Sequence, residues 1–111
     1  MSSVTANVVN NTSFAVTANP NDPSHGLKPT TPNPTVPARS TQSIVFVANS
    51  DGAGVEGSVS LNGDGKSFTL NYDNPVVGSN SGSVAAPSGY TGDCQAGSGT
   101  NATFTYTIGP A

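Results

Sequence analysis

The chain has 111 residues, which suits one domain with one hydrophobic core. Charged residues make up 8% of it, and the formal net charge is −3, with three positive side chains at Lys28, Arg39 and Lys66. Phosphate contacts need clustered cations, so we exclude nucleic acid as a partner. No run of apolar residues reaches the length that a membrane-spanning helix needs.

The first residues, Met1 to Ser3, show neither the basic region nor the apolar stretch of a secretory signal. We therefore expect a protein that is cytoplasmic or secreted by a non-classical route. Cys94 is the single cysteine and His25 the single histidine, so no intramolecular disulfide and no clustered Cys/His zinc site can form. We expect no metal and no cofactor.

Alternation of apolar and polar residues at the start of the chain predicts two short strands, over residues 4–8 and 14–18, with a turn between them. The segment from Asn19 to Pro37 contains six prolines, which forbid a continuous strand or helix. Irregular segments of this length are usually functional or mobile. A purely structural alternative is an extended strap over one sheet edge, which would block edge-to-edge pairing. We favour an extended strap over one edge.

Residues 41–49 form the most apolar run of the chain. Ile44 and Phe46 alternate with Val45 and Val47, so both faces of this segment are apolar. We therefore predict a central strand here.

Residues 54–81 organise the rest of the chain, because they read as a β-hairpin followed by a sharp turn. Apolar residues alternate from Val55 to Leu61 and again from Phe68 to Tyr72. Between them, Asn62 to Gly65 supplies the Asn-Gly and Asp-Gly pairs that hairpin connections favour. The pairing should end at Pro75, which has no N–H to donate.

The C-terminal part predicts a short strand at 84–86, a polar loop at 88–101 and a last strand at 102–108. About seven short strands without helical periodicity predict an all-β fold, a single-domain antiparallel β-sandwich over residues 1–111 with a long Pro-rich loop. The predicted core consists of Val8, Phe14, Val16, Ile44, Phe46, Val59, Leu61, Phe68, Leu70, Phe104, Tyr106 and Ile108.

Three patterns suggest chemistry that the context does not support. Gly52 to Gly57 fits G-x-G-x-x-G, but a strand and not a helix follows, so these glycines are expected to permit a bulge or a close backbone approach. The acidic residues from Asp51 to Asp73 lack the dense spacing of a calcium loop. His25 lies in the Pro-rich segment, and no nucleophile elbow exists. We therefore expect a protein that is not an enzyme.

Three stretches together resemble the aegerolysin family, whose members are small fungal and bacterial β-sandwich proteins. These are Val8 to Asn11, then the strand opening Gly54 to Val59, then the turn Tyr72 to Asn80 with its aromatic-Asp-x-Pro order. The closing strand with Phe104 and Tyr106 follows in the same order. The layout is similar, more distantly, to actinoporin-like sandwiches.

The resemblance implies binding to membrane lipids, namely sphingolipid–sterol or ceramide phosphoethanolamine surfaces, and cytolysis together with a larger pore-forming partner. An apolar pair at the turn tip would insert shallowly. A carboxylate would meet a cationic head group, and a tyrosine would offer its ring face. The candidate contact residues are Glu56, Tyr72, Asp73, Val76, Val77, Asn80 and Tyr90.

Two other functions fit the same residues. A lectin-like module that binds a glycan would use Asn, Asp, Gly and a stacking Tyr on loops. A self-associating structural or storage protein, a homo-oligomer, would use the low surface charge. Binding to liposomes, retention on a glycan column and self-association without ligand distinguish the three readings.

Overall fold

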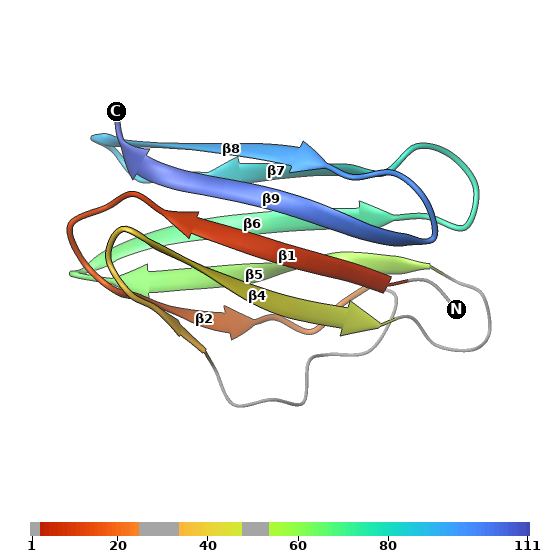
Figure 1. The fold of residues 1–111 in the computed structure, drawn as a ribbon, viewed down its shortest axis with the longest axis horizontal. Helices are drawn as coiled ribbons and strands as arrows, with labels where there is room; N and C mark the ends of the chain where they lie inside the picture. Colours follow the sequence, from red (N-terminus) through yellow and green to blue (C-terminus); the bar gives the residue numbers. More distant parts are fainter. Residues whose placement is uncertain (1–2, 25–33, 48–53) are drawn as a thin grey trace.

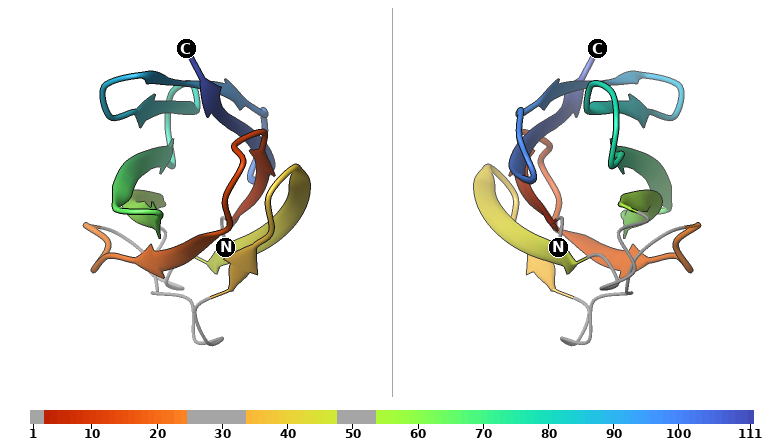
Figure 2. Two further views of the ribbon diagram at one scale, coloured as in Figure 1. Left: turned by 90° about the vertical axis from the view of Figure 1, so that its left-hand side faces the viewer. Right: turned by 90° about the vertical axis from the view of Figure 1, so that its right-hand side faces the viewer.

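The computed structural model describes residues 3–24, 34–47 (backbone alone for 44–47) and 54–111. They form a β-sandwich, as predicted, in which two sheets curve around one core (Figures 1 and 2). The strands are β1 (Ser3–Asn10), β2 (Val16–Pro20), β3 (Thr35–Val36), β4 (Ser40–Val47), β5 (Val55–Gly63), β6 (Lys66–Asn74), β7 (Ser81–Ala85), β8 (Tyr90–Ala96) and β9 (Asn101–Pro110).

The four-stranded sheet has the order β4-β1-β9-β8, and the five-stranded sheet has the order β3-β2-β5-β6-β7. The first and last strands, β1 and β9, lie side by side and run parallel, with Ser3 opposite Asn101. The other described ladders are antiparallel. Inward-facing side chains of both sheets form the core between them.

Nine of the twelve residues predicted to form the core are buried. They are buried because every second side chain of these strands faces inward. Phe14 is half-buried and packs against the core from the β1–β2 connection. The side chains of Ile44 and Phe46 lie outside the described residues. The buried apolar residues are Val4, Ala6, Val8, Val16, Ala18, Val36, Val55, Val59, Leu61, Phe68, Leu70, Tyr72, Ala102, Phe104, Tyr106 and Ile108.

The β5–β6 hairpin confirms the predicted turn chemistry. Asp64 and Gly65 have φ values of 50° and 71°, the left-handed conformation that a tight hairpin connection requires. Gly54, just before β5, has a φ of 85°, and a Cβ there would lie 2.8 Å from the carbonyl oxygen of Asn74. The expected close backbone approach is therefore present at this glycine.

Two strand predictions were wrong. The segment predicted as a polar loop at 88–101 contains β8, whose small and polar residues pair with the more apolar β9. The segment predicted as a central strand at 41–49 contains β4, which lies at the edge of its sheet. An apolar run indicates a strand but does not tell a central position from an edge.

The Pro-rich segment contributes more regular structure than its prolines suggested. Pro20 ends β2 opposite Val59, and β3 pairs with β2 at Thr35 and Val36. β3 lies at the edge of the five-stranded sheet, so this part of the segment covers an edge by pairing with it. His25 and the rest of residues 25–33 lie outside the described residues, as does Asp51.

The end of the molecule that carries the β1–β2 connection is held by a buried asparagine and an aromatic cluster. The Asn10 side-chain amide lies 2.9–3.2 Å from the carbonyl oxygens of Phe14, Val36 and Pro37. Tyr90 packs edge-on against Phe14 and also against Phe68, with ring centroids 5.8 and 5.6 Å apart. We call this the aromatic end; it is the left-hand end in Figure 1.

Candidate functional site

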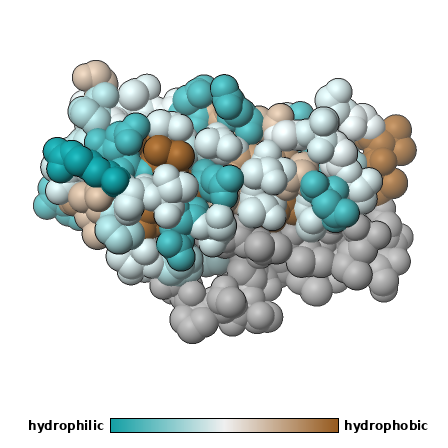
Figure 3. All heavy atoms as spheres, viewed as in Figure 1, coloured by the Kyte–Doolittle hydropathy of each residue, from teal (hydrophilic) through white to brown (hydrophobic). Residues whose placement is uncertain are grey.

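The opposite end carries the large apolar side chains that are exposed among the described residues. Val76 and Val77 are 59% and 87% exposed, at the tip of the connection between β6 and β7. Pro75 precedes them and Gly78, with a φ of 107°, follows, so the chain reverses at this point. Figure 3 shows an apolar patch at this end of the molecule. We call Pro75 to Asn80 the tip.

Two asparagines hold the tip to the neighbouring loop. Asn74 is buried, and its side-chain amide donates to the carbonyl oxygens of Ser3 and Thr100 at 3.0 and 2.9 Å. The amide of Asn80 donates to the carbonyl oxygens of Gly97 and Gly99, at 2.9 and 3.1 Å. The tip is therefore tied to the β8–β9 loop at both of its ends, which fixes the direction in which the valines project.

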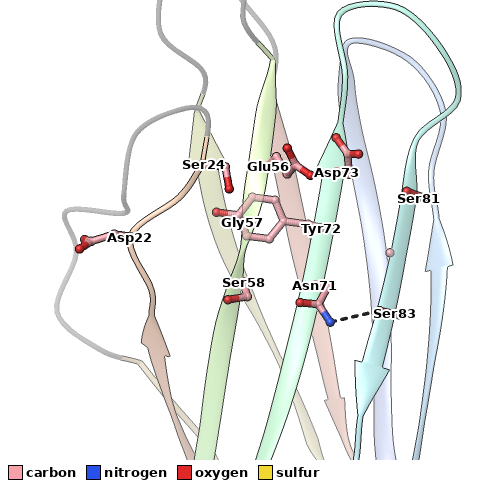
Figure 4. A pocket seen from close by; sticks show the side chains of 11 residues that line it. Asp22, Ser24, Glu56, Gly57, Ser58, Asn71, Tyr72, Asp73, Ser81 and Ser83 are labelled. Atoms are coloured by element: carbon pink, nitrogen blue, oxygen red, sulfur yellow. Dashed lines mark hydrogen bonds between the residues drawn. The ribbon is translucent and has the colours of Figure 1, made fainter.

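A shallow trough of about 570 Å³ lies on the outer face of the five-stranded sheet beside the tip (Figure 4). Two rows of outward side chains, each crossing β5, β6 and β7, form its walls. One row is Glu56, Asp73 and Ser81, and the other is Ser58, Asn71 and Ser83. The row between them is Gly57, Tyr72 and Gly82, whose side chains face inward, so backbone forms the floor.

The segment after β2 closes one side of the trough. Asn21 and Ser24 donate backbone N–H bonds to the carbonyl oxygens of Ser58 and Glu56, at 3.0 and 2.8 Å. This places Asp22 and Ser24 on the trough's lining. The trough therefore combines three carboxylates with serine hydroxyls and one side-chain amide.

The charged residues that line the trough, among those the structure describes, are all acidic. Glu56 and Asp73 are directly opposite each other on paired strands, and like charges in such a pair repel. Among the described residues the cations are Arg39, between β3 and β4, and Lys66, at the start of β6. Lys66 is seven residues from Asp73 along the strand, roughly 23 Å at the usual rise. The carboxylate pair is thus available to a positive group from outside.

Tyr72, predicted to offer its ring face to a cationic head group, is instead part of the core and only 2% exposed. A Cβ at Gly57 would meet the Tyr72 hydroxyl, so this glycine makes room for the ring against β5. Burial raises the pKa of Tyr72 to about 12. The ring lies on the core side of the trough floor and does not present an open face.

The structure brings six of the seven predicted contact residues to one end: Glu56, Tyr72, Asp73, Val76, Val77 and Asn80. Tyr90 belongs to the aromatic end, at the start of β8, and does not join them. Sequence reasoning missed the second wall at Ser58, Asn71 and Ser83. The signal was present, because these residues are the outward positions of predicted strands, but the register that aligns them was not known.

Three further findings concern the thiol, metal ligands and membrane-spanning helices. Cys94 is half-buried beside Tyr106, and burial, more than the neighbouring Asp93, raises the pKa of its thiol. Within the described ranges, no group of three or more His, Cys, Asp or Glu side chains is arranged to hold a metal ion. None of the described residues forms a helix that is long and apolar enough to cross a bilayer.

Comparison with known proteins extends the description of the fold. No family profile matches the sequence, and no curated protein matches it either. Among solved structures, the chain is similar to IP-1A from Alcaligenes faecalis, with a TM-score of 0.72 and 16% sequence identity. The match covers 98% of this chain and 91% of IP-1A. The same all-β sandwich fold is therefore present in IP-1A, and the likeness concerns the fold alone.

Proposed function

We propose that the chain is a non-enzymatic protein that binds the surface of lipid membranes through the tip. The observation that carries the proposal is the exposure of Val76 and Val77, two adjacent apolar residues on a turn fixed from both sides. Burying apolar surface is favourable by about 25 cal/mol per Å², so two valines supply a modest but directed contact with the bilayer interface. The resemblance of the sequence to aegerolysins supports the same function.

The charges near the tip indicate which surfaces would bind. Glu56 and Asp73 lie on the face beside the valines, and no described cation accompanies them. Attraction to anionic lipids needs basic residues, so this end favours neutral and zwitterionic surfaces. Sphingolipid–sterol and ceramide phosphoethanolamine mixtures are surfaces of that kind.

Shallow insertion of two valines does not perforate a bilayer. We therefore propose that cytolysis, where it occurs, requires a second, pore-forming protein, and that this chain supplies the attachment to the membrane. The corresponding expectation is that the purified chain binds vesicles without releasing an entrapped dye.

Sedimentation with liposomes tests the proposal. Phosphatidylcholine alone is compared with sphingomyelin–cholesterol and with ceramide phosphoethanolamine–cholesterol vesicles. We expect the protein to pellet selectively with a sphingolipid–sterol mixture, and Val76→Asp to reduce pelleting at least tenfold because a charge cannot enter the interface cheaply. Protein that stays in the supernatant with every mixture would contradict the proposal.

The matched control is Asn62→Asp, which adds the same charge at an exposed position of β5 near the aromatic end. It should pellet like the unaltered protein. Equal losses for Val76→Asp and Asn62→Asp would show that net charge, and not the tip, governs binding.

A further inference from the structure

We propose that the trough is a binding site for an amino sugar that carries a free, protonated amino group. The proposal rests on the two walls and the floor of the trough and not on the tip. It therefore stands or falls separately from membrane binding.

The two walls of the trough offer different chemistry on opposite sides. Glu56 and Asp73 accept hydrogen bonds and attract a cation, and a primary ammonium has three N–H donors for them. The opposite wall, Ser58, Asn71 and Ser83, both donates and accepts. Asn71 donates to the Ser83 hydroxyl at 3.1 Å, which leaves the Asn71 side-chain carbonyl outside that bond. A ligand with an ammonium on one edge and hydroxyls on the other matches this pattern.

The trough favours a primary ammonium over a quaternary one. Quaternary ammonium groups are recognised by aromatic faces, because they have no N–H to donate. The Tyr72 ring is buried, and Tyr90 lies at the aromatic end. The lining side chains thus present carboxylates, hydroxyls and an amide to the ligand, but no open aromatic face.

The trough also disfavours a phosphate inside it. Arg39 and Lys66 are the cations among the described residues, and neither lines the trough. A phosphate lying between the walls would face Glu56 and Asp73, and no cation of the described part of the chain lies there to compensate its charge. A sugar with an amino group and neutral hydroxyls avoids this repulsion, whereas a phosphorylated head group does not.

The volume of the trough suits a ligand the size of one sugar ring. The two wall rows are two residues apart along each strand, roughly 7 Å at the usual rise. The floor is backbone at Gly57, Tyr72 and Gly82, so no outward side chain lies between the walls. The volume of about 570 Å³ falls within the roughly 300–1,000 Å³ that is usual for small-molecule sites.

Titration followed by ¹⁵N–¹H correlation spectra tests the proposal on the intact protein. D-Glucosamine should shift the amide signals of Gly57 and Gly82 with a Kd in the millimolar range. N-Acetyl-D-glucosamine, which lacks the charge, should bind at least tenfold more weakly, and so should choline. Glu56→Gln combined with Asp73→Asn should weaken glucosamine binding at least tenfold, whereas Asp93→Asn, on the other sheet, should leave it unchanged.

The amide spectra also report whether each variant is folded, and removal of a repelling pair is not expected to disrupt β5 or β6. Val76→Asp should bind glucosamine normally, which separates this site from the tip. Equal binding of the two sugars, or shifts confined to residues outside the trough, would overturn the proposal. Ethanolamine that binds as well as glucosamine would overturn the part of the proposal that concerns the sugar ring.

Discussion

The two ends of the sandwich are closed in opposite ways. At the aromatic end, Asn10 binds three carbonyl oxygens in the interior, and Tyr90 packs on Phe14 and Phe68. At the tip, asparagine amides bind loop carbonyls, and the apolar side chains of Val76 and Val77 point outward. One end uses its apolar groups for stability, and the other leaves them available for contact with a partner.

In a chain with few charges, a binding surface can lie where apolar side chains are exposed on a turn that other bonds hold in place. A turn that exposes valines must be held by bonds that do not require those valines. Asn74 and Asn80 provide such bonds, because their partners are main-chain oxygens of the neighbouring loop. The comparison predicts that changes at the aromatic end affect mainly stability, while changes at the tip affect stability less.

The largest effect is expected for Asn10→Ala. The Asn10 amide donates to carbonyl oxygens in the interior, and its side-chain oxygen accepts from the Thr12 N–H at 3.0 Å. The substitution removes the partner of all these groups. Unsatisfied buried groups cost about 1–3 kcal/mol each, so the free energy of unfolding should fall by about 3 kcal/mol or more in urea denaturation. Asn62→Ala, at an exposed position, should change it by less than about 0.5 kcal/mol. Similar values for both variants would show that the buried hydrogen bonds of Asn10 do not stabilise the aromatic end.

Alkaline pH should have the next largest effect, and it should act through the half of the molecule near the tip. The pKa of Tyr72 is about 12 in the folded protein, against the ordinary tyrosine value of 10.0, which applies to the unfolded chain. The protonated Tyr72 hydroxyl contributes to the free energy of unfolding, and this contribution is fully present below pH 10. It is lost as the pH rises towards 12, because the unfolded chain releases the tyrosine proton at a lower pH than the folded chain does. The loss should be on the order of 2 kcal/mol.

Urea midpoints measured between pH 8 and 11.5 would follow this change. Tyr72→Phe should flatten the decline in part, because burial also raises the pKa of Tyr106. A decline of the same steepness in Tyr72→Phe would show that Tyr72 does not cause it.

Asn74→Ala removes the corresponding buried amide at the end that carries the tip. The side chain is 2% exposed, and its loss frees the carbonyl oxygens of Ser3 and Thr100 near the surface, where water can partly replace it. We expect the free energy of unfolding to fall by about 2 kcal/mol, together with faster hydrogen exchange of the Ser3 amide, which donates to Thr100. A loss larger than that of Asn10→Ala would reverse the ranking of the ends.

The smallest effect is expected for Asn80→Ala. Its two acceptors belong to the exposed loop at Gly97 and Gly99, so water can take the place of the amide. The free energy of unfolding should fall by less than about 1 kcal/mol in the same denaturation experiment. A loss comparable to that of Asn74→Ala would mean that the β8–β9 loop contributes more to stability than its exposure suggests.

Periodicity predicted the strands that have a strongly apolar inner face. Val55 to Leu61 and Phe68 to Tyr72 alternate clearly, and the Asp64-Gly65 turn between them fixes their register. β8 was missed because its inward positions are Gly92 and Cys94, which pack closely against β7 without adding an apolar signal. Where a strand packs through small residues, the sequence pattern is too weak to show it.

The candidate site was predicted in part for a related reason. Glu56, Asp73, Val76 and Val77 are close in sequence, or close through one hairpin, so their proximity follows from the chain itself. The contribution of Ser81 and Ser83 depends on the pairing of β7 with β6, and that of Asp22 on the path of the chain after β2. Such long-range alignments are set by packing, and the local pattern does not contain them.

The parallel pairing of β1 with β9 has a consequence for how the protein is made. Val4 lies opposite Ala102, so the first strand finds its neighbour only after almost the whole chain is available. During synthesis β1 can pair with β4 early, but the four-stranded sheet is complete only when the C-terminal strand has left the ribosome. Contacts that are so distant in sequence slow folding, and truncation from the C-terminus should leave an N-terminal strand with an open edge that is prone to aggregation.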